Sequence, residues 1–261
     1  MIQSITLCKN IDASKVSFTK MDNIGNNFLL SYPQYNNKPF ILQSPTIKVM
    51  NGCIHVSKTN PYANPFMIIA IDPKQSNCLE FENGLSNIDQ FVINNKDKIF
   101  GNAYQQIQFE PIIKTPISHD DCDDPKNKKQ YLTKPKMKYC KMHFDINYQN
   151  KIQTKIIVKS HQNKSPTHLN SPTMEDINSH LALHNEVRAI FMISKLLLHD
   201  PSHKTNFYLK LLALEITVQD TKLQSFDLAL LENMSDEIDD TDKDDENDED
   251  DFDNFVLEIC I

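Results

Sequence analysis

The chain has no tryptophan, one arginine and only four glycines among 261 residues. With so few glycines there is no phosphate-cradling loop, no dinucleotide-binding fingerprint and no nucleophile elbow. No apolar run approaches the roughly 20 residues of a membrane-spanning helix, and the first residues lack the apolar core of a signal peptide. These absences argue against a nucleotide-dependent enzyme, a serine hydrolase and a membrane protein. We expect a soluble intracellular protein.

Cysteine pairs are also missing, because the six cysteines are scattered and none forms a Cys-x-x-Cys motif. A disulfide framework is therefore disfavoured. Three side chains, Cys122, Cys140 and His143, could act as metal ligands, but structural zinc normally has close ligand pairs at both ends of its site. The acidic run DDCDD points its carboxylates in divergent directions and is better explained as a loop. We expect no metal, no cofactor and no catalysis.

Charge is distributed unevenly along the chain, whose net charge is −8. Residues 232–261 hold 15 carboxylates and one lysine, a net of −14, and residues 1–231 hold 26 basic and 20 acidic side chains, a net of +6. The segment 235–254 has almost no apolar side chains, which predicts disorder. The end of the chain is apolar, with Phe252 and Phe255 among its residues. The sequence therefore predicts a single domain over 1–231 and an acidic flexible tail with an apolar tip over 232–261.

The first half of the domain contains short, β-prone apolar segments separated by Pro, Asn and Gly, which is typical of a sandwich or barrel. Strands are predicted at 28–32, 40–43, 47–49 and 66–71. One helix is predicted after them, with Ser86 and Asp89 as its capping pair and Gly101 at its end.

The second half begins with two predicted strands at 137–144 and 154–159, and the alternation in the second should give one buried and one basic face. A mobile connector is predicted at about 160–172, because this stretch is rich in Ser, Asn and Pro. A helix should then run from Thr173 to about residue 184.

Two long apolar runs, 187–198 and 207–218, flank a turn-rich linker. They favour a hairpin of two strands, because the second run alternates. A buried helix at 187–198 is the alternative.

The most informative segment is 125–164, which contains 11 lysines and one acid, interleaved with Tyr and Phe. Binding of an unpaired nucleic-acid strand needs both kinds of group, because ammonium ions replace counterions on the phosphates and rings stack on the bases. A solvated basic face is the alternative interpretation. The predicted nucleic-acid-binding residues are Lys126, Lys128, Lys129, Tyr131, Lys134, Lys136, Lys138, Tyr139, Lys141, Phe144, Lys155 and Lys159.

The acidic tail has a functional interpretation of its own, beside that of a solubilising tail. A flexible polyanion can lie in a cationic groove and compete with nucleic acid, while its apolar tip engages partner proteins. The predicted partner-binding residues are Asp248, Glu249, Asp250, Asp251, Phe252 and Phe255.

Several segments, taken in order, resemble a known family. They are QSPTI followed by Asn51-Gly52, NPFMIIAID, LSNIDQFV, FEPIIK before KPKMKYCKMHFD, the helix start at Thr173–Asp176, and the EVRAIFMISKLLL and FYLKLLALEITV pair. This order resembles the single-stranded-DNA-binding proteins of nucleocytoplasmic large DNA viruses. It is more distantly similar to bacteriophage single-stranded-DNA-binding proteins that also end in an acidic tail with aromatic residues.

The resemblance implies an OB-fold barrel that coats exposed DNA strands during viral replication, recombination and repair, without catalysis. We expect a mainly β fold, an OB-like barrel with additional strands and two or three peripheral helices. Single-stranded DNA and, through the tail, replication proteins are the expected partners, and a homo-oligomer stays open. The implied location is the replication site in the host cytoplasm or the nucleus, with packaging in the virion also open. The alternatives are a virion or scaffold interaction protein and a processivity-type factor on duplex DNA.

Overall fold

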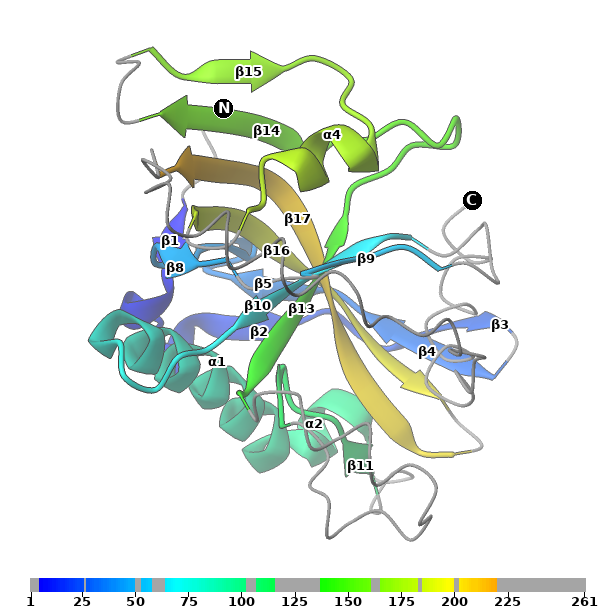
Figure 1. Ribbon diagram of the computed structural model, residues 1–261. Coiled ribbons are helices and arrows are strands. Elements are labelled where there is room, and N and C mark those ends of the chain that lie inside the picture. The colour runs from blue at the N-terminus through cyan, green and yellow to red at the C-terminus, as the bar shows by residue number, and fades with distance from the viewer. Residues whose placement is uncertain are drawn as a thin grey trace, which may run out of the picture.

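The computed structural model describes residues 5–25, 27–49, 53–57, 64–101, 107–115, 137–160, 165–182, 185–199 and 202–219. Over these residues the protein is mainly β with peripheral helices (Figure 1), which confirms the predicted fold class. The strands are β1 Thr6–Leu7, β2 Val16–Phe18, β3 Asp22–Gly25, β4 Phe28–Ser31, β5 Pro33–Tyr35, β6 Lys38–Pro39, β7 Ile41–Gln43, β8 Ile47–Lys48, β9 Ile54–His55, β10 Phe66–Ala70, β11 Gln108–Phe109, β12 Ile113–Lys114, β13 Tyr139–Phe144, β14 Lys155–Ser160, β15 Thr167–Leu169, β16 Glu186–His199 and β17 Lys204–Val218. The helices are α1 Ser76–Asn94, α2 Lys96–Phe100 and α4 Met174–Ser179, with short 3₁₀ turns η1 Cys8–Asn10 and η2 Ala13–Lys15. Within this part of the chain, no helix combines the length and apolar character needed to cross a membrane.

The centre of the sheet is an antiparallel hairpin of the two longest strands, β16 and β17. Alternate side chains along it, such as Phe191, Ile193 and Leu209, are buried, and most of those between them are partly exposed. Burial with a period of two is the pattern of a strand, since a helix would bury one stripe with a period of 3.6. The predicted hairpin is confirmed, and the helix alternative for 187–198 is wrong.

The other strands assemble around this hairpin. The main path of the sheet is β1-β7-β16-β17-β13-β10-β9, and the pairings between the described strands leave it open rather than closing a ring. β13 and β14 both pair with β17 in parallel, while β10 pairs with β13 antiparallel. A small second sheet has the order β2-β5-β6. In Figure 1, β9, β10 and β13 lie toward the viewer, and β2 and β4 lie behind.

The helix after β10 begins earlier than the sequence indicated. α1 starts at Ser76 rather than near Ser86, and α2 then ends before Gly101, as predicted. Gly101 adopts the left-handed conformation, φ 82°, that favours glycine after a helix. Ser86 and Asp89 lie inside α1 because its buried face extends back beyond Phe81, so they do not form an N-terminal capping pair.

Two close contacts fix α1 in place. Both carboxylate oxygens of Asp89 accept the Ile112 N–H, at 3.3 and 3.1 Å, which ties the segment before β12 to the helix. Burial raises the pKa of Asp89 to about 7, although the Ile112 hydrogen bond and the charge of Lys114 act in the opposite direction. At the other contact, a Cβ on Gly84 would collide with the carbonyl oxygen of Cys8, so glycine allows α1 to lie directly on η1.

α4 begins as predicted, with a reciprocal cap. The Thr173 hydroxyl accepts the Asp176 N–H at 3.1 Å, and the Asp176 carboxylate accepts the Thr173 N–H at 2.8 Å. The helix ends at Ser179, before the predicted end. The predicted mobile connector at 160–172 is partly wrong, because it contains β15, which pairs with β14 as an edge strand. A polar sequence suits an exposed edge as well as it suits a connector.

Candidate nucleic-acid interface

Half of the predicted nucleic-acid-binding residues lie outside the described part of the chain: Lys126, Lys128, Lys129, Tyr131, Lys134 and Lys136. The tail residues and the predicted boundary at 231–232 also lie outside it, beyond Gln219. The other six predicted residues, Lys138, Tyr139, Lys141, Phe144, Lys155 and Lys159, lie on or next to β13 and β14. Because both strands pair with β17, the sheet brings the two lysine-rich segments of the sequence together.

The basic residues of β13 have different neighbours. Lys138, just before the strand, forms an ion pair with Glu82 on α1. Tyr139 is half-buried at the start of the strand. Lys141 lies over the ring of Phe66, with its Nζ 4.0 Å from the ring centroid.

The structure overturns the assignment of Phe144 as a base-stacking residue. Its side chain is 1% exposed and belongs to the main hydrophobic core. It shares this side of β13 with Met142 and Cys140, which are also fully buried. The period of two along a strand therefore separates Phe144 from Lys141, which the sequence interpretation had grouped with it.

The basic residues of β14 lie on the partly exposed side that its alternation predicted. Ile156 is buried, and Lys155 is exposed. Lys159 Nζ lies 2.6 Å from a carboxylate oxygen of Glu215 on β17. Arg188 on β16 donates from Nη2 to both oxygens of the same carboxylate, at 2.8 and 2.9 Å.

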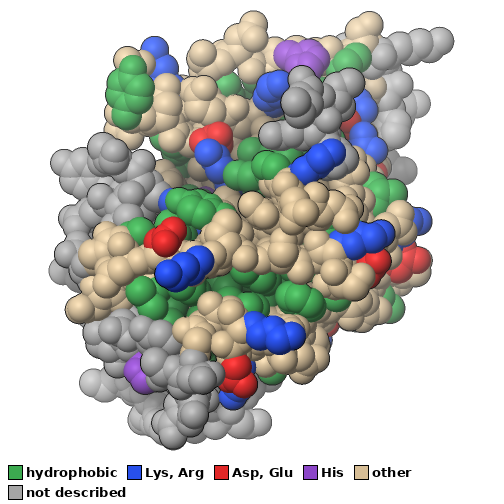
Figure 2. Space-filling model, turned by 180° about the vertical axis from the view of Figure 1, so that it is seen from behind, with side chains coloured by type: hydrophobic (Ala, Val, Ile, Leu, Met, Phe, Trp, Pro, Cys, Tyr) green, Lys and Arg blue, Asp and Glu red, His purple; other side chains and the backbone are tan. Residues whose placement is uncertain are grey.

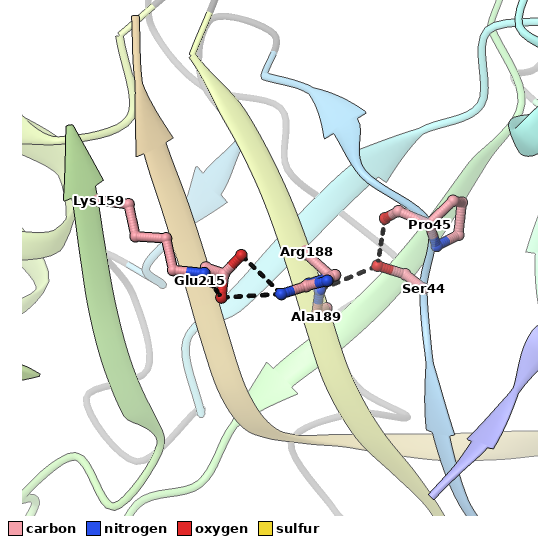
Figure 3. Close-up of polar contacts among 6 residues, drawn as sticks. All are labelled: Ser44, Pro45, Lys159, Arg188, Ala189 and Glu215. Atoms are coloured by element: carbon pink, nitrogen blue, oxygen red, sulfur yellow. Dashed lines mark hydrogen bonds and ion pairs between the residues drawn. The ribbon is translucent and has the colours of Figure 1, made fainter. Parts of the chain in front are cut away.

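Three neighbouring strands thus contribute to one ionic group, the Glu215 cluster of Lys159, Arg188 and Glu215 (Figure 3). Arg188 and Glu215 are directly opposite each other in the β16–β17 register. Burial alone would raise the pKa of Glu215, but the hydrogen bonds and charges of Lys159 and Arg188 outweigh it and hold this pKa below its usual value. The only arginine of the chain is therefore engaged by a carboxylate.

A row of aromatic rings crosses four strands near Lys141. We call this the ring row, and it consists of His55 on β9, Phe66 on β10, His143 on β13 and Tyr208 on β17. The rings of His55 and Phe66 are stacked at 4.9 Å between centroids and 7° between planes, and those of His143 and Tyr208 at 4.3 Å and 16°. Phe66 and His143 join the two pairs at 5.7 Å, with tilted planes. Cross-strand pairing places the rings together, since Phe66 is paired with both histidines.

Two lysines lie over the ring row from different strands. Lys141 covers Phe66, and Lys195 Nζ lies 5.9 Å from the centroid of Tyr208. Lys195 reaches this position because a β-bulge shifts the register between Ile193 and Lys195, which brings Lys195 opposite Tyr208. A bulge inserts one residue and so changes the side of the strand on which the following side chains lie. Both ammonium groups are within cation–π range of a ring.

Tyr208 is held by polar and apolar contacts. Its hydroxyl accepts a hydrogen bond from Asn64 Nδ2 at 3.0 Å, and its carbonyl oxygen accepts one from the hydroxyl of Ser194 at 3.1 Å. The ring packs against a small apolar cluster formed by Leu30 and Leu197. These contacts restrict the ring, so that little rotamer entropy would be lost when a ligand packs on it.

The polar neighbour of the ring row is another ion pair. Lys210, opposite His143 in the strand register, lies 2.9 Å from the carboxylate of Asp145. Asp145 is positioned by Thr154, whose hydroxyl accepts the Asp145 N–H at 2.8 Å and donates to the Leu211 carbonyl at 2.7 Å. Lys210 is therefore held by a carboxylate, as Lys159 and Arg188 are.

This arrangement can bind a planar, anionic polymer. His55 is exposed at one end of the ring row, and Phe66 and Tyr208 are half-buried, so a base can continue the stack or pack on the exposed parts of the rings. Lys141 and Lys195 can follow phosphates beside the bases. With lysine rather than arginine at the row, the contacts are point charges without the bidentate geometry that reads base edges.

Sequence reasoning identified Lys141 but missed all four rings and Lys195. One local signal was present, because Lys141 and His143 alternate with the apolar Cys140 and Met142, which predicts that the two share a side of the strand, although His143 itself is buried. The other members come from distant strands, so only the sheet pairing reveals them. Within the described ranges, no three His, Cys, Asp or Glu side chains are grouped so that they could hold a metal ion.

Comparison with known proteins adds little to this geometry. No protein-family model and no curated protein matches the sequence. Among solved structures, the chain is similar to gp2.5, a single-stranded DNA binding protein encoded by bacteriophage T7, with a TM-score of 0.39 and 9% sequence identity, over 79% of this chain and 99% of that one. A likeness this slight does not assign a family, so the interpretation of the ring row rests on the chain's own side chains.

Proposed function

We propose that the protein binds single-stranded DNA with little sequence preference, using the ring row for bases and Lys141 and Lys195 for phosphates. The observation that carries the proposal is the set of four rings, drawn from four strands, with two ammonium groups over them. A solvated basic face would not need stacked rings, or a bulge that turns a lysine toward one of them.

The same observation favours an unpaired strand over a duplex. In a duplex the base faces are stacked on one another, so protein rings reach them only after the stack is opened, at a cost of a few kcal/mol. Single strands offer base faces without this cost, and stacking on rings tolerates every base. Base-edge readout in the major groove relies most often on arginine, and Arg188 is engaged by Glu215.

Fluorescence anisotropy with labelled oligo(dT), a mixed-sequence single strand and its duplex tests the proposal on the full chain. We expect similar affinity for the two single strands, weaker binding to the duplex, and a steep loss of affinity between about 50 and 200 mM salt. Preference for the duplex would support an accessory factor on double-stranded DNA. No binding to any of the three would favour a virion or scaffold protein, and either result overturns the proposal.

We further propose that the protein acts without catalysis, coating strands exposed during viral DNA replication, recombination and repair, in the host cytoplasm or nucleus. The ordered sequence segments that resemble viral single-stranded-DNA-binding proteins support this role. Fluorescence microscopy of the tagged protein in infected cells, with labelled nascent DNA, tests it. Co-localisation is expected, and a protein that stays apart from nascent DNA at all times contradicts the role.

The acidic tail is proposed to compete with DNA for the basic face and to recruit replication proteins. Its net charge of −14 is the support for competition. Removal of residues 235–261 should therefore tighten binding of oligo(dT), most clearly at low salt, where charges are least screened. Equal affinity of the two chains at low salt would contradict competition by the tail.

A further inference from the structure

A second surface of the protein combines apolar residues with lysines, but it is hollow. It is an open groove of about 600 Å³, within the size range of ligand pockets, between β2, β4 and the helices α1 and α2. We call it the α2 groove, and its lining residues are Ser17, Phe18, Thr19, Lys20, Met21, Leu29, Phe91, Asn95, Lys98, Ile99, Phe100 and Gly101. Figure 2 shows the side of the molecule on which β2 and β4 lie, where apolar side chains gather and Lys or Arg side chains, with some Asp or Glu, lie around them.

The floor of the α2 groove is the open side of a hydrophobic cluster. Phe100 is buried in this cluster, while Phe18, Met21, Leu29 and Ile99 pack against it and are only half-buried. Phe18 also stacks on Phe91, at 6.3 Å between centroids and 15° between planes. Contiguous half-exposed apolar side chains of this kind mark binding surfaces, because covering them releases the hydrophobic free energy that partial exposure leaves unused.

The edge of the α2 groove is cationic, and one of its walls is polar. Lys20 and Lys98 line it and are both exposed. The hydroxyl oxygen of Ser17, also in the lining, is buried and has no hydrogen-bond partner among the described residues. A ligand that suits this surface has apolar side chains for the floor and carboxylates for the lysines.

We propose that the apolar tip of the chain's own acidic tail occupies the α2 groove, with Phe252 and Phe255 on its floor. In the sequence DEDDFDNFVL the two rings are flanked by carboxylates, which matches an apolar floor between Lys20 and Lys98. This inference goes beyond DNA binding, because the groove shares no residue with the ring row.

The length of the chain permits the contact. From Gln219, the last described residue, to Phe252 there are 33 residues (252 − 219). A flexible segment of this length has a root-mean-square span of roughly 30 Å, and can extend to roughly 110 Å. Tethering within one molecule gives an effective concentration that can reach the millimolar range, so even a weak contact is populated.

Cysteine cross-linking on the full-length protein tests this proposal, because the tip carries its own thiol at Cys260. In a Cys122→Ser background, Lys98→Cys places a thiol at the edge of the α2 groove, and Lys9→Cys places one on η1, away from the basic face, as a matched control with the same loss of charge. The cysteines among the described residues, Cys8, Cys53, Cys78 and Cys140, are buried. Under mild oxidation we expect a monomeric species cross-linked to Cys260 at least fivefold faster with Lys98→Cys than with Lys9→Cys.

The tip variant Phe252→Ser/Phe255→Ser keeps the thiol and the charges, and lies far from the folded core in the sequence. It should reduce the Lys98→Cys cross-linking rate to that of the Lys9→Cys control. Equal rates for the two thiols with the native tip overturn the proposal, as does a rate that the tip variant leaves unchanged. Cross-linked dimers in place of monomers would show that a second copy supplies the tip, which overturns binding within one molecule. The oligo(dT) affinity of the protein is measured separately. Failure of the tail contact and failure of the proposed DNA binding can therefore be told apart.

Discussion

The ring row and the Glu215 cluster each include one residue of β17, Tyr208 and Glu215, and two cationic side chains lie at each site, but their chemistry differs. At the ring row, Lys141 and Lys195 lie over aromatic faces. At the cluster, Lys159 and Arg188 are both within 2.9 Å of a single carboxylate. A carboxylate that holds a cation must be displaced or shared before a phosphate can bind that cation. The number of basic residues in a segment therefore says less about binding than the groups beside them.

The largest effect should follow from removing the rings. Phe66→Leu together with Tyr208→Leu keeps apolar volume but removes two planar faces, each worth about 1–3 kcal/mol by substitution in other single-strand-binding proteins. We predict at least a tenfold loss of oligo(dT) affinity, measured by anisotropy, with the salt dependence nearly unchanged because no charge is altered.

The control for the rings is Tyr148→Leu. Tyr148 is 86% exposed, more than any other large hydrophobic side chain in the described part of the chain, and lies outside the ring row. If this variant lost as much affinity as the double variant, exposure rather than the row would matter, and the proposed site would be wrong. Thermal melts of all variants, followed by circular dichroism, show whether each protein remains folded.

Charge at the ring row should have the next largest effect. Lys141→Gln together with Lys195→Gln removes two ammonium groups and should lower the slope of log affinity against log salt by roughly 1.4, about 0.7 for each phosphate contact on a single strand. Affinity at low salt should fall several-fold. An unchanged slope would show that phosphates do not pass over the ring row.

The sequence predicts those features of the two sites that depend on residues close together in the chain, and it fails for those that depend on strand pairing. The alternation in 154–159 and the turn-rich linker between the two apolar runs are local, and both predictions were confirmed. Phe144 failed because a lysine-rich composition does not show on which side of a strand a ring lies. Lys195 was missed because its position depends on a β-bulge, which no residue pattern in the chain announces.

The four rings of the ring row could not be grouped from the sequence either, because their contacts are not local. His55 and Tyr208 are 153 residues apart (208 − 55), and they join the same row because β9 pairs with β10, β10 with β13, and β13 with β17. The alternation of apolar and polar residues indicates the two sides of a single strand, and it does not show which strands pair. The ring row depends on how four strands pair in the sheet. The only part of it that the sequence indicates is the alternation of Lys141 and His143 within one strand.

Neutralising the carboxylate of the Glu215 cluster should make its cations able to bind phosphates, as proposed for the lysines at the ring row. Glu215→Gln removes the charge that holds Lys159 and Arg188, so both cations should become available to phosphates. We predict oligo(dT) affinity a few-fold tighter at low salt, with a slope steeper by up to about 1.4. Weaker binding by this variant would contradict the view that Glu215 restrains the two cations. Glu80→Gln, an acid on the exposed surface of α1, controls for the change in net charge.

The same carboxylate predicts a pH dependence of stability. The pKa of Glu215 is lower in the folded protein than its usual 4.5, so its ion pairs stabilise the fold above that value, and this contribution is lost as the pH falls through the lower, folded pKa. The free energy of unfolding in urea should therefore favour the native chain over Glu215→Gln at pH 7, with a smaller difference at pH 3.5. A difference that grows on acidification would contradict the assigned direction.

The smallest predicted effect comes from substitution of Lys155. This substitution tests how far a bound DNA strand extends along β17. Lys155 is exposed on β14 and pairs with Ala213, between the ring row and the Glu215 cluster in the register of β17. If a bound strand continues from Tyr208 toward Glu215, Lys155→Gln should weaken binding about twofold and lower the salt slope by about 0.7, one phosphate contact. Lys9→Gln, an exposed lysine on η1, should change neither. If Lys155→Gln matched Lys9→Gln, the strand would end at the ring row, and the restraining role of Glu215 would then lose its physical basis, because no phosphate would approach the cations that it holds.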